Sequence, residues 1–152
     1  MTFKAERIIL HCSASANGKP VDISEVEKWH LARGFSKVGY HIVINTTGEA
    51  QRGRFLNEAG AHCEGENHNS IGICMIGTNK FTKQQWDSLR SQIDSIRISL
   101  NIPASKIYGH YQMPSAIKQG KTCPCFEIGE FYSWYLASDY KAIDKYTLKE
   151  VL

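Results

Sequence analysis

Four side chains in two distant parts of the sequence are of the types that zinc prefers. His11 follows a short apolar run near the N-terminus, whereas His110, Cys123 and Cys125 lie in the stretch GHYQMPSAIKQGKTCPCF. Two imidazoles and a thiolate suit zinc, and three protein ligands leave a fourth position for solvent. The separation of 13 residues between His110 and Cys123 matches no zinc-finger pattern. A zinc site is therefore one interpretation, and a hydrogen-bonded surface histidine at position 11 is the ordinary alternative.

The cysteines as a group indicate free thiols. Their number is odd and the chain has no recognisable export signal, so a disulfide framework is not expected. Reduced thiols serve either as core side chains or as metal ligands. A redox pair is a further alternative for the CPC sequence, although it lacks the C-x-x-C spacing. The cysteines are Cys12, Cys63, Cys74, Cys123 and Cys125.

The strand predicted at 7–12 places His11 and Cys12 on opposite faces. Side chains alternate along a strand, so His11 shares a face with Ile9, and Cys12 points the other way. The two residues are therefore not expected to bind the same ion. His11 stands at the carboxyl end of its strand, where ligand sites of α/β folds collect.

Length, composition and charge limit the classes of protein to which this chain can belong. The chain has 152 residues, 42% of them hydrophobic, with a net charge of +3 and a pI near 8.6. These values fit one soluble domain and do not indicate a nucleic-acid partner. The apolar stretch 8–10 is too short for a signal peptide or a membrane span, so we expect cytoplasmic synthesis without membrane insertion.

The elements that must position these side chains alternate between strands and helices. This order predicts an α/β fold, with one mixed sheet of about five strands flanked by about three helices. We expect a single domain spanning 1–152, with a core at about 7–136 and an extension at 137–152. Capping boxes are predicted at Ser24–Glu27 and Thr82–Gln85. The predicted strands are 7–12, 39–45, 50–55, 71–77 and 106–110, and the predicted helices are 24–34, 82–101 and 126–136.

Several stretches taken together carry a family resemblance over about 7–135. They are HCSAS at 11–15, WH…GF…VGYHIVI at 29–44, AHCEGENHNSIGICMIG at 61–77 and GHYQM…KTCP at 109–124. In this order they resemble the zinc-dependent N-acetylmuramoyl-L-alanine amidases. The resemblance is specifically to the small bacteriophage lysozyme-type members, which are related to peptidoglycan recognition proteins.

The resemblance implies a role for each of five residues. His11, His110 and Cys123 match the zinc ligands, and Tyr40 and Lys121 match the active-site tyrosine and lysine. It implies one zinc ion per chain and cleavage of the amide between N-acetylmuramic acid and L-alanine in peptidoglycan. Released to the wall, the protein would act as a phage endolysin. The interval between His110 and Cys123 is longer than in compact phage enzymes.

Polar residues in the loop at 59–70 are candidates for substrate contacts. His62, Asn67 and Asn69 are of types that bind sugar and peptide groups, although an asparagine-rich turn explains them equally well. Two alternatives to a hydrolase remain open. One is a non-catalytic peptidoglycan-binding module, and the other is an amidase that also regulates a phage RNA polymerase. The first alternative is disfavoured by Cys123 and Lys121.

Overall fold

The computed structural model describes residues 3–139 and 141–149, and its centre is a five-stranded sheet. The order across the sheet is β3-β2-β4-β1-β5. β1 is parallel to β4 and β5, and β2 is parallel to β4, but β3 is antiparallel to β2. The predicted mixed sheet is therefore confirmed, and the antiparallel β2 and β3 form a hairpin. The strands are β1 Arg7–Cys12, β2 Ile42–Ile44, β3 Ala50–Arg52, β4 Ser70–Met75 and β5 Ile107–Gly109.

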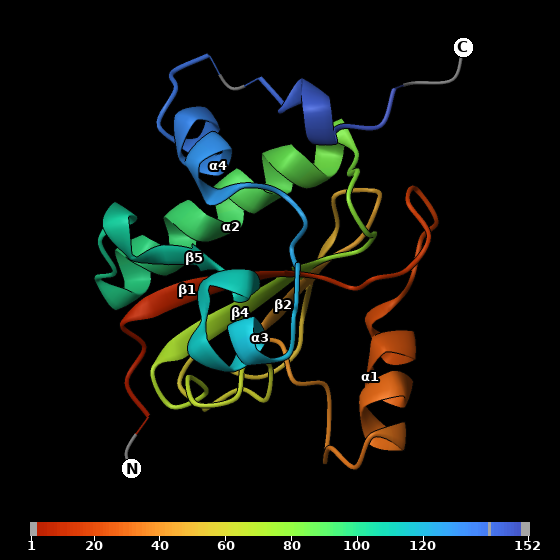
Figure 1. Ribbon diagram of the computed structural model, residues 1–152, viewed down its shortest axis with the longest axis vertical. Helices are drawn as coiled ribbons and strands as arrows, with labels where there is room; N and C mark the ends of the chain where they lie inside the picture. The colour runs from red at the N-terminus through yellow and green to blue at the C-terminus, as the bar shows by residue number, and fades with distance from the viewer. Residues whose placement is uncertain (1–2, 140, 150–152) are drawn as a thin grey trace.

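Helices cover both faces of the sheet (Figure 1). α2 and α4 pack on one face, and α1 and α3 lie on the other. The three predicted helices are present, and α3 lies in a stretch expected to be a loop. In the described part of the chain no helix is long and apolar enough to cross a bilayer. The helices are α1 Ile23–Ala32, α2 Lys83–Leu100, α3 Pro114–Lys118 and α4 Ile128–Tyr135, with 3-10 turns at Ala104–Lys106, His110–Gln112 and Asp144–Tyr146.

The larger core lies between the sheet and the α2–α4 layer. Ile8 and Ile73 of the sheet and Trp86 of α2 are completely buried there. Trp86 makes an edge contact with Trp134 of α4, their ring centroids 5.1 Å apart. Full burial of one large apolar side chain contributes about 1.5–3 kcal/mol. This layer therefore holds the central strands in place from the side opposite His11.

The two predicted capping boxes have different outcomes. At α2 the Thr82 hydroxyl accepts from Gln85 N at 3.0 Å, and Gln85 Oε1 accepts from Thr82 N at 2.9 Å. That box is confirmed. The box predicted at Ser24 is wrong, because α1 begins at Ile23 and Asp22 is its N-cap. The Asp22 carboxylate accepts from both Ser24 N and Ser24 Oγ.

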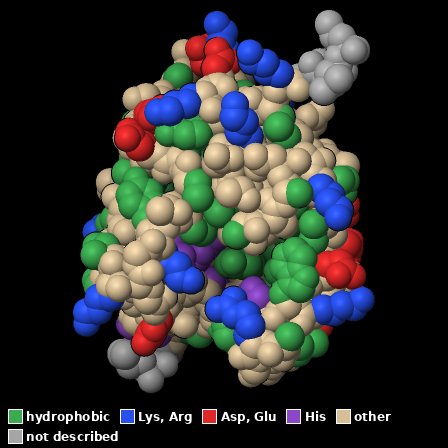
Figure 2. All heavy atoms as spheres, turned by 45° about the vertical axis from the view of Figure 1, so that its right-hand side comes forward, with side chains coloured by type: hydrophobic (Ala, Val, Ile, Leu, Met, Phe, Trp, Pro, Cys, Tyr) green, Lys and Arg blue, Asp and Glu red, His purple; other side chains and the backbone are tan. Residues whose placement is uncertain are grey.

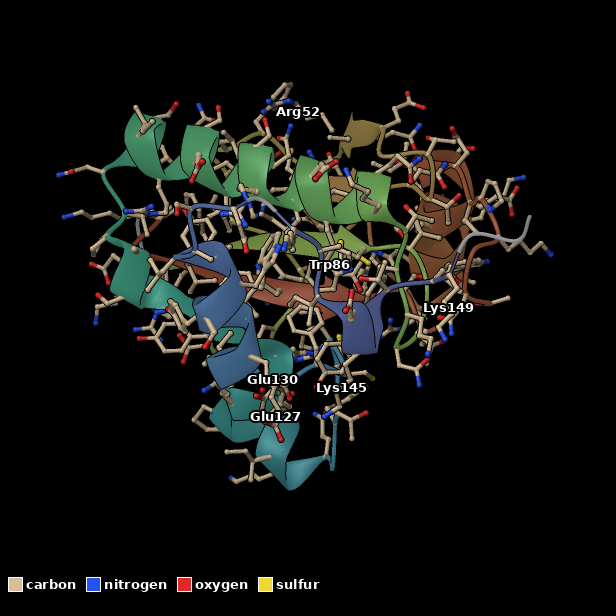
Figure 3. The ribbon with its side chains drawn as sticks, turned by 90° about the horizontal axis from the view of Figure 1, so that it is seen from above. Arg52, Trp86, Glu127, Glu130, Lys145 and Lys149 are labelled. Atoms are coloured by element: carbon tan, nitrogen blue, oxygen red, sulfur yellow. The ribbon has the colours of Figure 1, made fainter. Side chains whose placement is uncertain are left out.

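The described part of the extension packs on the α2–α4 layer (Figure 3). Tyr146 is buried, and its carbonyl accepts from Phe81 N at 2.8 Å and from Trp86 Nε1 at 3.3 Å. Lys145 forms an ion pair with Glu130 of α4 at 3.3 Å. The chain after α4 therefore contributes to the core on the face opposite His11.

Candidate metal centre

Two neighbouring parallel strands bring His11 and His110 together. Leu10 of β1 stands in register with Gly109 of β5, so the residues that follow them, His11 and His110, lie side by side near the carboxyl ends of the two strands. The ring centroids of His11 and His110 are 4.5 Å apart. Residues separated by about a hundred positions thus become neighbours because parallel strands end side by side.

Backbone hydrogen bonds bring Cys123 to the same place. Tyr111 N donates to the carbonyl of Cys123 at 2.9 Å, which ties the returning loop to the chain just after His110. Cys12 N donates to Cys123 Sγ at 2.9 Å. The long interval between the two predicted ligands is therefore accommodated by α3 and its flanking turns.

The three predicted ligands form one cluster. The ligand atoms of His11, His110 and Cys123 all lie within 4.8 Å of one another. A set of two imidazole nitrogens and one cysteine sulfur at these distances fits a tetrahedral zinc site with one position open. Cys125 has different surroundings, because its Sγ lies 4.0 Å from Cys12 Sγ and 3.5 Å from Thr122 Oγ1.

Burial keeps the imidazoles at this cluster neutral. It lowers the pKa of His11 well below the ordinary value, and neighbouring histidines add to the effect. Burial also lowers the pKa of His110 to about 4, with a further contribution from the Lys121 cation. A histidine must be unprotonated on the nitrogen that binds a metal. The environment therefore already favours the form that a cation requires.

The cluster opens onto a cavity of about 780 Å³. Figure 2 shows histidine side chains at the bottom of a hollow in the surface, with basic side chains near its rim. Tyr40 and Lys121 both line this cavity, and the Tyr40 ring centroid is 5.1 Å from that of His11. Burial raises the pKa of the Tyr40 phenol well above its ordinary value. Tyr40 can therefore donate a proton in a hydrogen bond, and Lys121 can present a cation.

The three predicted substrate-contact residues have separate locations. His62 and Asn67 line the cavity, but both ring nitrogens of His62 contact protein groups. Asn67 Oδ1 accepts from the backbone N–H groups of His62 and Cys63, both at 2.9 Å. Asn69 is not among the residues that line the cavity, and its Nδ2 donates to Glu66 Oε2. The structure thus brings two of the three to the site.

The cavity is also lined by polar residues that were not predicted from the sequence to belong to the site. Arg33 follows α1, and its guanidinium stacks 5.2 Å from the ring of Phe35. Ser115 and Gln119 come from α3 and its C-cap, and Glu64 lies opposite them in the loop before β4. Their types and spacing carry no signal of their own. They reach the cavity only because α1 and α3 pack on the same face of the sheet.

Comparison with known proteins identifies a family. A family model described as N-acetylmuramoyl-L-alanine amidase matches residues 2–126. The endolysin of Enterobacteria phage T3 is 32% identical over 135 residues, covering 84% of this chain and 85% of that protein.

Solved structures show the same fold. The amidase LysC from Clostridium intestinale superposes with a TM-score of 0.75 at 26% identity, covering 87% of this chain and 85% of that one. Drosophila PGRP-LB superposes with a TM-score of 0.73 at 24% identity, covering 91% of this chain and 89% of that one. The predicted α/β amidase fold is confirmed by these structures. On the family match, the shared fold and the endolysin relative, this chain belongs to the N-acetylmuramoyl-L-alanine amidase family.

Proposed function

We propose that this protein is a zinc-dependent amidase that hydrolyses the bond between N-acetylmuramic acid and L-alanine in bacterial peptidoglycan. One observation carries the proposal. In a chain of the amidase family, the ligand atoms of His11, His110 and Cys123 converge within 4.8 Å at the base of an open cavity. These three residues would hold one zinc ion.

The protein groups around the cluster supply what hydrolysis of an amide requires. A zinc ion held by these residues would supply polarisation of the scissile carbonyl and activation of water. Lys121 and Tyr40 face the same cavity as the predicted ligands. A cation and a phenol hydroxyl can both stabilise the negative charge that develops on the carbonyl oxygen. We assign that role to them.

The relatives favour a lytic role at the cell wall. The phage T3 relative is named an endolysin, and this chain aligns with 85% of its length. We propose the same role for this chain, with peptidoglycan as its macromolecular substrate. The regulatory role toward a phage RNA polymerase stays a prediction, and a pull-down with candidate polymerases would test it.

A non-catalytic binding module is the competing function. Retention of a muropeptide without cleavage needs the cavity but not a complete ligand set. The presence of Cys123 beside both histidines, and of Lys121 in the same cavity, favours hydrolysis.

The decisive experiment combines metal analysis with mass spectrometry of digested peptidoglycan. Purified protein should contain about one zinc ion per chain, as three ligands with one open position require. Digestion should release peptides with new L-alanine amino termini, and a chelator should stop this until zinc is restored. Binding of muropeptides without new amino termini would instead establish the binding module. New reducing sugar ends would show that another bond is cut.

A further inference from the structure

His62 connects the first predicted ligand to a hydroxyl deeper in the fold. Its Nδ1 lies 2.9 Å from Nε2 of His11, and its Nε2 lies 3.3 Å from Oγ of Ser70. The first distance is that of a good hydrogen bond, and the second is at the long end of the range. Both nitrogens of the His62 ring therefore have protein partners, which leaves neither free for a substrate.

The surrounding backbone is shaped to hold this ring in place. A Cβ on Gly72 of β4 would lie 2.5 Å from Cγ of His62, and a Cβ on Gly60 would lie 2.5 Å from its Cδ2. Any side chain at either glycine would collide with the ring. The loop is anchored at the same point, because Asn67 Oδ1 accepts from His62 N. The position of the ring is therefore determined by close packing as well as by hydrogen bonds.

The hydrogen bonds determine where the protons lie. The Ser70 hydroxyl donates its single proton to the carbonyl of Glu66 at 2.6 Å. Toward His62, the Ser70 oxygen can then only accept, so His62 Nε2 carries a proton. A neutral His62 has no proton on Nδ1, which must accept from Nε2–H of His11. Nδ1 of His11 then has a lone pair, and no donor among the described residues forms a hydrogen bond with it.

We propose that His62 is a positioning residue that holds His11 in the Nε2–H tautomer, so that Nδ1 is the atom offered to the metal. Metal-binding histidines commonly donate their second N–H to a fixed acceptor, which sets both the tautomer and the ring orientation. In this chain the acceptor is a second histidine rather than a carboxylate. The identity of the metal rests on the proposed function, but the assignment of the tautomer does not.

Nuclear magnetic resonance with isotope-labelled histidine tests the tautomer directly. Long-range proton–nitrogen correlations on the full chain, with and without zinc, should show the His11 proton on Nε2. In His62→Leu this preference should be lost in the zinc-free chain. A proton on Nδ1 of His11 in the wild-type chain would overturn the proposal, whether or not the protein binds zinc.

Zinc affinity supplies the second readout, measured by competition with a chromogenic chelator. His62→Leu should bind zinc about 10- to 100-fold more weakly than wild type, the usual effect of removing an outer partner of a ligand. His62→Asn should recover most of this loss, because its Oδ1 can accept at the position of Nδ1. His68→Leu is the matched control in the same loop, since His68 does not line the cavity.

The outcomes separate this proposal from the proposed function. Unchanged zinc affinity in a folded His62→Leu would overturn the positioning role while leaving the zinc amidase intact. Thermal melting followed by circular dichroism establishes whether each variant is folded. If His62→Leu is unfolded, the zinc affinity of His62→Asn and the nuclear magnetic resonance spectrum of the wild-type chain test the positioning role instead. A wild-type chain that binds no zinc would overturn the proposed function, and the spectrum would still decide the tautomer.

Discussion

At the scale of single residues, two cysteines two positions apart have different partners. The sulfur of Cys123 accepts a hydrogen bond from Cys12 N and belongs to the cluster with the two histidines. The sulfur of Cys125 instead lies near the sulfur of Cys12 and the hydroxyl of Thr122. The backbone of Cys125 is in the left-handed region, with φ of 67°. The pair therefore offers a built-in comparison between a proposed ligand and a neighbour of the same type.

Exchanging each cysteine for serine should separate their roles. Cys123→Ser should lose zinc and peptidoglycan hydrolysis, because a serine hydroxyl is a far weaker zinc ligand than a thiolate. Cys125→Ser should keep the zinc content and most of the activity. Metal analysis and a peptidoglycan-clearing assay on both variants provide the measurement. The reverse pattern would exchange the roles of the two residues.

Substitution of Lys121 should lower the rate of peptidoglycan hydrolysis without releasing the zinc ion. Loss of one donor to a developing oxyanion lowers kcat by about 10²–10³, or about 2.7–4 kcal/mol. Lys121→Ala should therefore show such a loss with zinc still bound. Lys118→Ala is the matched control, because Lys118 is exposed on α3 and does not line the cavity. Release of zinc from Lys121→Ala would show that this lysine supports the site structurally.

At the scale of the elements, the site depends on where strands and helices end. β1 and β5 deliver the two histidines at one edge of the sheet, and α3 occupies the interval before Cys123. The start of α1 is equally specific. Asp22 caps it and also accepts from Gln51 Nε2 at 2.7 Å, which links the helix to β3.

The Asp22 cap predicts a pH dependence of stability. Hydrogen bonds from Ser24 and Gln51 lower the pKa of the Asp22 carboxyl from 3.8 to about 2. Because the folded-state pKa is depressed, the stabilisation is fully present above about pH 4 and is lost as the pH falls toward 2. The free energy of unfolding should therefore decline more steeply over this window in wild type than in Asp22→Asn, which keeps a cap without a charge.

Urea unfolding curves at several pH values between about 2 and 5 measure this difference. Glu25→Gln is a suitable control, since Glu25 lies in the same first turn and forms an exposed ion pair with Lys28. Parallel curves for wild type and Asp22→Asn across the window would contradict the assignment of Asp22 as the cap.

At the scale of the whole molecule, the sheet separates the site from a supporting layer. α2, α4 and the segment after α4 pack on one face, and the cavity opens on the other. Tyr146 joins this segment to the core through its buried ring and through the bonds of its carbonyl to Phe81 and Trp86. Its hydroxyl donates to Glu130 at 3.1 Å.

Truncation of Tyr146 should destabilise the fold without changing the metal site. Tyr146→Ala should cost about 3 kcal/mol of unfolding free energy, as for other buried aromatic rings. Tyr146→Phe should cost about 0.5–1.5 kcal/mol for each of the two hydrogen bonds of its hydroxyl, which donates to Glu130 Oε1 and accepts from Glu127 N. Urea unfolding measures both, with exposed Lys141→Ala as the control. An unchanged stability of Tyr146→Ala would mean that the segment is not part of the cooperative fold.

Local patterns in the sequence were sufficient for much of this protein. Apolar runs predicted the strands, and the Thr82–Gln85 box predicted the start of α2. Side-chain chemistry singled out His11, His110 and the two cysteines at 123 and 125, and the family resemblance then selected Cys123. These are properties of short segments and of residue types, which depend little on distant parts of the chain. The cap at Asp22 was missed because two neighbouring residues, Asp22 and Ser24, both suit an N-cap, and packing against β3 decides between them.

The tertiary structure alone decided which distant groups meet. The parallel register of β1 with β5 sets the two histidines side by side, and the loop through α3 returns Cys123 rather than Cys125 to them. The contact of His62 with His11 depends on two glycines and on a hydroxyl of β4. Such contacts span from 51 to 111 positions along the chain, so no local preference encodes them. They follow from the close packing of the complete fold.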